Sequence, residues 1–221
     1  MNVLAIGDIH GRRNWQSISF GAYDKVVFAG DYVDSFRIPE TDITDVLEAV
    51  IGLKRHDPER FVLLLGNHDI QYLYFPHYPC SGFRPAMQPA WTHLFRENES
   101  FFQVAWQHDN YLFTHAGVSY RWASRCGLTP SAGLFNEMRQ TPDGREILFS
   151  CGAFRGGPPS AAGGIVWADQ RETYRDYYPG WHQVVGHTPQ PFIRRIGDEE
   201  SSITYIDVLE RSASFWEKAF A

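Results

Sequence analysis

Five short polar segments, each directly after a run of apolar and β-prone residues, constrain this chain most. They are Gly7-Asp8-Ile9-His10-Gly11, Gly30-Asp31-Tyr32-Val33-Asp34, Gly66-Asn67-His68-Asp69, Thr114-His115-Ala116-Gly117 and Gly186-His187-Thr188. The repeated arrangement predicts strands that all end at one edge of a sheet and load that edge with oxygen and nitrogen atoms. A two-metal hydrolytic site needs such a collection of ligands.

The first third of the sequence has the pattern of a parallel α/β sheet. Strands are expected at Val3–Ile6, Lys25–Ala29 and Phe61–Leu65. Between the last two, apolar residues recur from Ile43 to Ile51 with helical spacing, and Thr41 is the expected N-cap. Strand, helix and strand predict a right-handed crossover with parallel pairing, and the site of such a sheet lies at the carboxyl ends of its strands.

The rest of the chain is less regular. Residues 71–90 are rich in proline and aromatic side chains, and we expect them to form a lid-like excursion beside the site. The other expected elements are a helix over Trp91–Gln107, strands at Tyr111–Thr114 and Gln183–Val185, a loop over Ser150–Gly164, and a closing hairpin of Ile203–Val208 with Ala213–Trp216. No linker or internal repeat is visible, so one domain spanning residues 1–221 is expected.

Charge and cysteine content narrow the classes of protein. A formal net charge of −6 argues against a nucleic-acid partner, which normally binds a basic surface. A phosphorylated substrate remains compatible, because bound cations would reverse the local charge. The three scattered cysteines favour a reducing, cytoplasmic location over a disulfide framework. No apolar stretch approaches the roughly 20 residues of a membrane span, so neither a signal segment nor a membrane anchor is expected.

Side chains from the five segments form a candidate metal centre. At the end of a strand Asp8 and His10 point the same way and can reach one ion, and Asp31 can bridge two ions with its two oxygens. The remaining candidate ligands are Asn67, His115 and His187. Each residue alone would more often cap a turn or satisfy a local hydrogen bond, but the joint pattern favours metal binding. A mixed carboxylate, amide and imidazole set suits Mn²⁺, Fe or Zn²⁺.

These segments resemble the calcineurin-like metallophosphoesterase superfamily, whose pattern runs D-x-H, G-D-x-x-D, G-N-H-[DE], a lone H and G-H. Order and spacing match from Asp8 to His187. The variants G-D-I-H-G, G-D-Y-V-D and G-H-T-P are similar to the phosphoprotein-phosphatase branch, which includes bacterial and phage phosphatases and symmetrical dinucleoside-tetraphosphate hydrolases. Thr188-Pro189 stands where other branches carry a further histidine. The resemblance implies an α/β fold, a β-sandwich flanked by helices in four αββα layers.

The resemblance also implies a role for each side chain. The implied ligands of one ion are Asp8, His10 and Asp31, and those of the second are Asp31, Asn67, His115 and His187. His68 would be the general acid, and Asp34 would orient its imidazole and raise its pKa. The implied cofactors are two divalent or transition metal ions, Mn²⁺ as first choice, with Fe or Zn²⁺ as alternatives.

The phosphate clamp departs from the pattern of the branch. The usual G-D-x-V-D-R-G places an arginine after the second aspartate, whereas Ser35 and Phe36 stand here in place of Arg-Gly. Serine cannot provide a bidentate cationic fork. Two other arginines are therefore candidates for substrate binding: Arg37, two residues on, and Arg155, which precedes a W-x-D-like segment at 167–169 as a second phosphate-contacting arginine often does in this branch.

We therefore expect a metal-dependent phosphoric ester hydrolase that acts on a phosphoprotein, a small phosphoester or a dinucleoside polyphosphate. A phosphomonoesterase, of the serine/threonine type or a broad-specificity protein phosphatase, is the first hypothesis. A symmetrical dinucleoside-tetraphosphate hydrolase is the alternative, because the missing clamp arginine leaves the choice open. A third hypothesis is a non-catalytic scaffold with the same fold, which would have lost ligands or the acid histidine; this chain keeps them.

Overall fold

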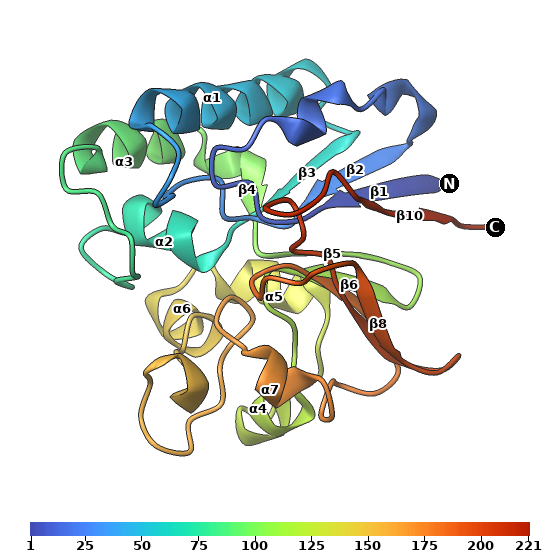
Figure 1. Ribbon diagram of the computed structural model, residues 1–221. Coiled ribbons are helices and arrows are strands. Elements are labelled where there is room, and N and C mark those ends of the chain that lie inside the picture. The colour runs from blue at the N-terminus through green and yellow to red at the C-terminus, as the bar shows by residue number, and fades with distance from the viewer.

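The computed structural model describes residues 1–221 and contains two five-stranded sheets (Figure 1). The first sheet has the order β10-β1-β2-β3-β4. Its strands are β1 (Asn2–Ile6), β2 (Lys25–Phe28), β3 (Phe61–Leu64), β4 (Phe102–Gln103) and β10 (Trp216–Ala219). The second sheet has the order β5-β6-β7-β9-β8. Its strands are β5 (Ala105–His108), β6 (Tyr111–Thr114), β7 (His182–Val185), β8 (Arg194–Gly197) and β9 (Ser202–Tyr205).

Alternating side chains on the strands of the first sheet build two separate cores. On β1, Val3 and Ala5 belong to a cluster shared with Phe113 of the second sheet, because the two sheets pack against each other. Leu4 and Ile6 point the opposite way, into the larger core beneath the helices. Both faces of this sheet are therefore buried, which explains why its strands read as continuous apolar runs.

Helices cover the outer side of each sheet. Three helices lie on the side of the first sheet, α1 (Glu40–His56), α2 (Asn67–Leu73) and α3 (Gln88–Glu97). Four lie on the side of the second sheet, α4 (Tyr120–Arg125), α5 (Ala132–Met138), α6 (Pro142–Leu148) and α7 (Gln170–Thr173) (Figure 1). The predicted α/β sandwich flanked by helices is confirmed. None of these helices combines the length and hydropathy that a membrane span requires.

Parallel pairing brings the polar segments to one end of the sandwich. β1 pairs with β2 and β2 with β3 in parallel, as predicted, and β6 pairs with β7 in parallel in the other sheet. The segments after β1, β2 and β3 therefore share one sheet edge, and those after β6 and β7 share another. The prediction of a single loaded sheet edge was wrong, because two sheets each contribute part of the site.

Three local predictions were wrong. Thr41 is not the N-cap of α1, since the helix begins at Glu40 after an extended Pro39 that makes no side-chain cap. The helix expected over Trp91–Gln107 ends at Glu97, because the following residues pair as β4 with β3 and as β5 with β6.

The expected closing hairpin does not form either. β9 pairs with β7 and with β8, a strand that the sequence pattern did not reveal, while β10 crosses to the other sheet and pairs antiparallel with β1. The pairings of β10 with β1 and of β9 with β7 join residues far apart in the sequence, so local periodicity carries no signal for them.

Candidate active site

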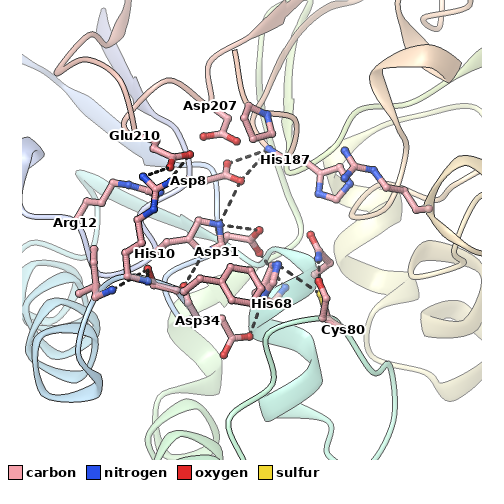
Figure 2. A pocket seen from close by; sticks show the side chains of 18 of the residues that line it. Asp8, His10, Arg12, Asp31, Asp34, His68, Cys80, His187, Asp207 and Glu210 are labelled. Atoms are coloured by element: carbon pink, nitrogen blue, oxygen red, sulfur yellow. Dashed lines mark hydrogen bonds and ion pairs between the residues drawn. The ribbon is translucent and has the colours of Figure 1, made fainter. Parts of the chain in front are cut away.

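A cavity of about 570 Å³ lies where the polar segments of the two sheets meet (Figure 2). Nine of the predicted site residues line it: Asp8, His10, Asp31, Asp34, Arg37, Asn67, His68, Arg155 and His187. His115, the tenth, lies fully buried behind the wall of the cavity, with Nε2 near His187. The structure thus brings all of the predicted site residues to one place.

The backbone at the site is held in an unusual conformation. His10, Asp31, Asp34 and His187 have φ angles of 45°, 55°, 59° and 67°. A left-handed residue other than glycine costs about 1–3 kcal/mol and persists only where its surroundings enforce it. Here the amides of Ile9 and His10 both donate to the Asp31 carbonyl, at 3.1 and 2.8 Å. The turns after β1 and β2 therefore fix each other.

Two glycines let carboxylates lie directly against the backbone. A Cβ at Gly66 would clash with the Asp31 carboxylate, and a Cβ at Gly186 would clash with that of Asp8. The His187 amide donates to both oxygens of Asp8, at 2.9 and 3.1 Å. The glycines of the G-N-H and G-H segments are thus required by close packing of the acidic side chains.

Asp69 connects the segments after β2 and β3. Its buried carboxylate accepts hydrogen bonds from the amides of Asp31, Tyr32 and Gly66, at 2.7 to 2.9 Å. Burial and the negative charge of Asp31 raise the pKa of Asp69. This residue points away from solvent and holds the backbone, so its contacts are those of a structural support.

Four side-chain atoms that carry lone pairs lie close together, and one of them belongs to Asp31. His115 donates from Nδ1 to the Ala29 carbonyl at 2.8 Å, which leaves Nε2 with a lone pair. Nε2 lies 3.0 Å from Asn67 Oδ1, 3.1 Å from His187 Nδ1 and 3.3 Å from Asp31 Oδ2. Lone pairs this close repel one another unless a proton or a cation lies among them.

The raised pKa of His115 also indicates that a positive charge is favoured at this position. Burial alone would lower it, but the Asp31 carboxylate raises the pKa of His115 to about 9, so the chain attracts a proton to this position. The His187 Nε2 is buried and has no hydrogen-bond partner. The donor set, two imidazoles, an amide and a carboxylate, therefore fits a divalent ion.

A second group of donors lies on the other side of Asp31. His10 donates from Nδ1 to the carbonyls of Val33 and Asp34, at 2.8 and 2.9 Å. Its Nε2 then faces Asp31 Oδ2 at 3.7 Å and Asp8 Oδ2 at 4.0 Å. Burial lowers the pKa of His10, which keeps its imidazole neutral, the form that binds metals. These residues fit a first ion, and Asp31 is common to both groups.

The imidazole of His68 contacts the Asp34 carboxylate, which is fixed in turn by two further hydrogen bonds. Its Nδ1 lies 2.9 Å from Asp34 Oδ2, and the same carboxylate accepts hydrogen bonds from Gln71 Nε2 and the Tyr72 hydroxyl, both at 2.6 Å. Burial lowers the pKa of His68, but the charge of Asp31 and the bond to Asp34 outweigh it and raise the pKa well above its usual value. These contacts favour the protonated form of the His68 imidazole.

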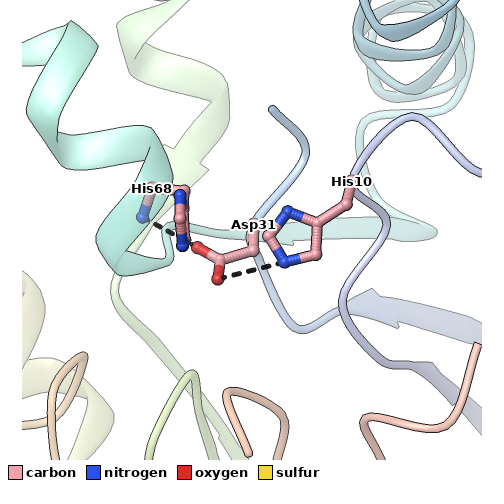
Figure 3. Close-up of side chains that lie close together, drawn as sticks. All are labelled: His10, Asp31 and His68. Atoms are coloured by element: carbon pink, nitrogen blue, oxygen red, sulfur yellow. Dashed lines mark hydrogen bonds and ion pairs between the residues drawn. The ribbon is translucent and has the colours of Figure 1, made fainter. Parts of the chain in front are cut away.

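The position of His68 also permits another arrangement. His10, Asp31 and His68 lie close enough to one another to hold one ion (Figure 3). The backbone amide of His68 donates to Asp31 Oδ1 at 2.9 Å, while its ring Nε2 lies 3.5 Å from Cys80 Sγ. Because Nδ1 of its ring is held by the Asp34 carboxylate and Nε2 lies beside Cys80 Sγ, a proton-donor role agrees better with these contacts than metal ligation does.

The two candidate arginines differ in how firmly they are held. Arg155 Nη2 donates to Thr188 Oγ1 at 2.9 Å, and its Nε lies 2.8 Å from Asp169 Oδ2. The Arg37 side chain is 83% exposed and contacts Glu210 at 3.1 Å. Both line the cavity, but only Arg155 is held by two side chains.

The sequence patterns missed several residues of the cavity. Those lining it are Arg12, Cys80, Asp207 and Glu210, and those behind it are Gln71 and Tyr72. Asp207 is the second residue after the end of β9, but the strand expected over Ile203–Val208 included it, so the pattern of a polar residue after a strand did not reveal it. Arg12 follows the first segment by one residue. Glu210 comes from an irregular stretch and carries no sequence signal.

Comparisons with known proteins agree with this fold. A point mutant of a cold-active protein tyrosine phosphatase has a TM-score of 0.63 and 17% identity, over 93% of this chain and 70% of that chain. The cold-active protein-tyrosine phosphatase of a psychrophilic Shewanella species gives 0.59 and 18%, over 93% and 70%. A protein serine/threonine phosphatase from Saccharomyces cerevisiae gives 0.55 and 15%, over 93% and 67%.

The family is given by a match along nearly the whole chain. The model of the calcineurin-like phosphoesterase family matches residues 1–211. No curated protein sequence matches significantly. The chain belongs to the calcineurin-like phosphoesterase family and is a phosphoric ester hydrolase.

Proposed function

We propose that the chain is a dinuclear metal-dependent phosphomonoesterase, of the serine/threonine type or with broad specificity for phosphoproteins. The observation that carries this proposal is the position of Asp31. Its carboxylate lies between the donors of His10 and those of His115, and it contacts the backbone of His68. One buried carboxylate shared by two donor groups is what a pair of neighbouring ions requires.

The proposed ligands follow from these two groups. Asp8, His10 and Asp31 would hold one ion, and Asp31, Asn67, His115 and His187 would hold the other. Mn²⁺ is the first choice, and Fe or Zn²⁺ are the alternatives for such a mixed oxygen and nitrogen set. When bound, the ions would polarise the phosphate oxygens and lower the pKa of the attacking water.

The side chains of the protein would do the remaining chemistry. His68 would donate the proton on Nε2 to the departing oxygen, since Nδ1 is engaged by Asp34. Asp34 is a positioning residue, which keeps the ring oriented and protonated. Arg155, which lines the cavity and is held by Asp169 and Thr188, would bind a phosphate oxygen with its guanidinium group.

More than one substrate is compatible with the proposed reaction. Phosphorylated serine or threonine in a peptide is the first candidate, and a small phosphoester is compatible with the same site. Hydrolysis of a symmetrical dinucleoside tetraphosphate is kept as the alternative, because Ser35 replaces the arginine that would define a phosphomonoester clamp.

Two further proposals concern the surroundings of the site. Residues 71–90 would act as a lid within one domain of residues 1–221, which is supported by Cys80 and Ser81 reaching the cavity wall from this segment. A cytoplasmic location is supported by the three cysteines, all of which are unpaired.

Metal-depleted protein reloaded separately with Mn²⁺, Fe²⁺ or Zn²⁺ tests the function. The substrates are a phosphoserine peptide, p-nitrophenyl phosphate and a dinucleoside tetraphosphate. We expect turnover of the first two, whereas preference for the third would favour the alternative. Inertness towards all three with every metal would contradict enzymatic activity of this kind and favour a scaffold.

A pair of histidine variants tests the proposed acid. His68→Ala should lower kcat by about 10²–10⁴-fold, the usual worth of general acid catalysis, while retaining bound metal. His93→Ala is the matched control, since the His93 side chain is 72% exposed and forms an ion pair with Glu97 away from the cavity lining. Equal turnover in the two variants would remove His68 from the mechanism.

A further inference from the structure

Two arginines at one end of the cavity share a single carboxylate. Arg12 Nη2 lies 3.9 Å from Glu210 Oε2, and Arg37 Nη1 lies 3.1 Å from Glu210 Oε1. All three side chains line the cavity, and Figure 2 shows Arg12 and Glu210 beside Asp8, across the cavity from Cys80. This is the geometry of a paired-guanidinium anion site in which an anion of the chain itself fills the place of a ligand.

The pair is separate from the proposed phosphate contact of Arg155. Arg155 is neutralised by Asp169 from α7's N-terminal boundary, whereas Arg12 and Arg37 come from the segments after β1 and β2. Arg12 is anchored because its Nη1 donates to the Ile9 carbonyl at 3.3 Å and only 21% of its side chain is exposed. The cavity therefore carries two sets of cationic side chains that are held by different carboxylates.

Glu210 is weakly held in this position. Its side chain is 44% exposed and that of Arg37 is 83% exposed, so water screens their attraction. A phosphoryl group carries more charge than a carboxylate and offers three acceptor oxygens to a guanidinium fork. It can therefore displace Glu210, which needs only to turn outward into solvent.

We propose that Arg12 and Arg37 form a second anion subsite that Glu210 closes in the absence of substrate. The subsite would bind the second phosphoryl group of a small, doubly phosphorylated organic ester while the first lies at the proposed ions. This inference rests on the proposed function and deepens it by naming the substrate class. Glu210 then determines specificity, because it competes with the second phosphoryl group.

Matched aryl phosphates test the subsite. Phenyl phosphate carries one phosphoryl group, and 1,3- and 1,4-phenylene bisphosphate carry a second at two different spacings on the same ring. The quantity compared is the ratio of kcat/KM for each bisphosphate to kcat/KM for phenyl phosphate, with Mn²⁺-loaded protein. The wild-type ratio should be about 20 or more, roughly tenfold above the factor of two that follows from two equivalent reacting groups.

Three variants test the subsite through this ratio, which two of them should lower and the third should raise. Arg12→Ala and Arg37→Ala should each lower it about tenfold, as the loss of a charge-assisted hydrogen bond predicts. Glu210→Gln, which keeps the shape and removes the charge, should raise it severalfold. Arg194→Ala, on the exposed strand β8, is the matched control and should leave it unchanged.

A binding measurement separates this proposal from the proposed function. Calorimetry of Mn²⁺-loaded protein with phenylphosphonate and 1,4-phenylene bisphosphonate, which cannot be hydrolysed, should show the same pattern in affinity. Failure of the proposed function would appear as inertness towards phenyl phosphate and towards the three substrates named above, while the affinities would still decide the subsite. The subsite is refuted if Glu210→Gln fails to tighten bisphosphonate binding, or if the arginine variants weaken both ligands equally.

Discussion

Two parts of the cavity are built in opposite ways. The floor consists of the buried side chains around the proposed ions and His68, and the rim consists of Arg12, Arg37 and Glu210. On the floor, Asp34 is buried and accepts three side-chain hydrogen bonds of 2.6 to 2.9 Å. On the rim, Arg37 and Glu210 meet in solvent across a single ion pair. The buried network fixes geometry before a substrate arrives, whereas exposed ion pairs exchange partners easily. We infer that the floor determines the reaction and the rim determines which substrate enters.

The largest effect is expected from Asp31→Asn, at the centre of the floor. Asp31 Oδ2 faces both donor groups while Oδ1 accepts from the His68 amide, so replacing the carboxylate by a neutral amide should weaken the binding of both proposed ions and lower kcat/KM by about 10³-fold or more. Elemental analysis after reloading, together with turnover of p-nitrophenyl phosphate, measures both changes. Asp42→Asn, an exposed carboxylate on α1, is the control. Full metal content in Asp31→Asn would contradict the shared-ligand arrangement.

The next effect concerns pH and Asp34→Asn. The pKa of His68 is raised by Asp31 and Asp34, so the acid is protonated at low pH and its contribution is lost as pH rises through that pKa. Replacing Asp34 removes one cause of the raised pKa, so the alkaline limb of kcat should move to lower pH by about one unit. A complete pH–rate profile checks this. An unchanged alkaline limb with lower kcat would mean that Asp34 only supports the fold.

A smaller effect is expected from Tyr72→Phe. The Tyr72 hydroxyl donates to Asp34 Oδ1 and accepts from the Arg84 amide at 2.9 Å. Its removal leaves buried polar groups without partners and should cost about 1–3 kcal/mol in the free energy of unfolding. Urea denaturation measures this, with Tyr120→Phe, at a half-exposed site, as control. Equal stability of the two variants would show that the floor is less rigid than its contacts indicate.

The smallest effect on stability belongs to the rim. Arg37→Ala removes one exposed ion pair and should change the free energy of unfolding by less than about 1 kcal/mol. The same denaturation experiment tests this. A larger loss would mean that the rim, like the floor, supports the fold, and the contrast between the two regions would disappear.

The sequence predicted the floor better than the rim for a physical reason. Short buried strands of the first sheet pair in parallel and place Asp8, Asp31 and Asn67 at their ends. Local sequence patterns were therefore enough to predict that these three residues lie close together. Their roles as ligands remain predictions. Glu210 reaches the cavity from an irregular stretch, and only the three-dimensional structure places it between Arg12 and Arg37.

Long-range strand pairing was the other limit. The strand β10 joins the first sheet by pairing with β1, its partner at the opposite end of the chain, and neither strand contains information about the other. For the same reason the sequence suggested one loaded sheet edge, whereas the site draws on two sheets.

Anomalous diffraction at the manganese edge from crystals grown with Mn²⁺ tests the central claim most directly. Two peaks are expected to flank Asp31, one beside His10 and one beside His115, with the ring of His68 coordinated to neither. A single peak, or a peak ligated by the imidazole of His68 together with His10 and Asp31, would contradict the claim.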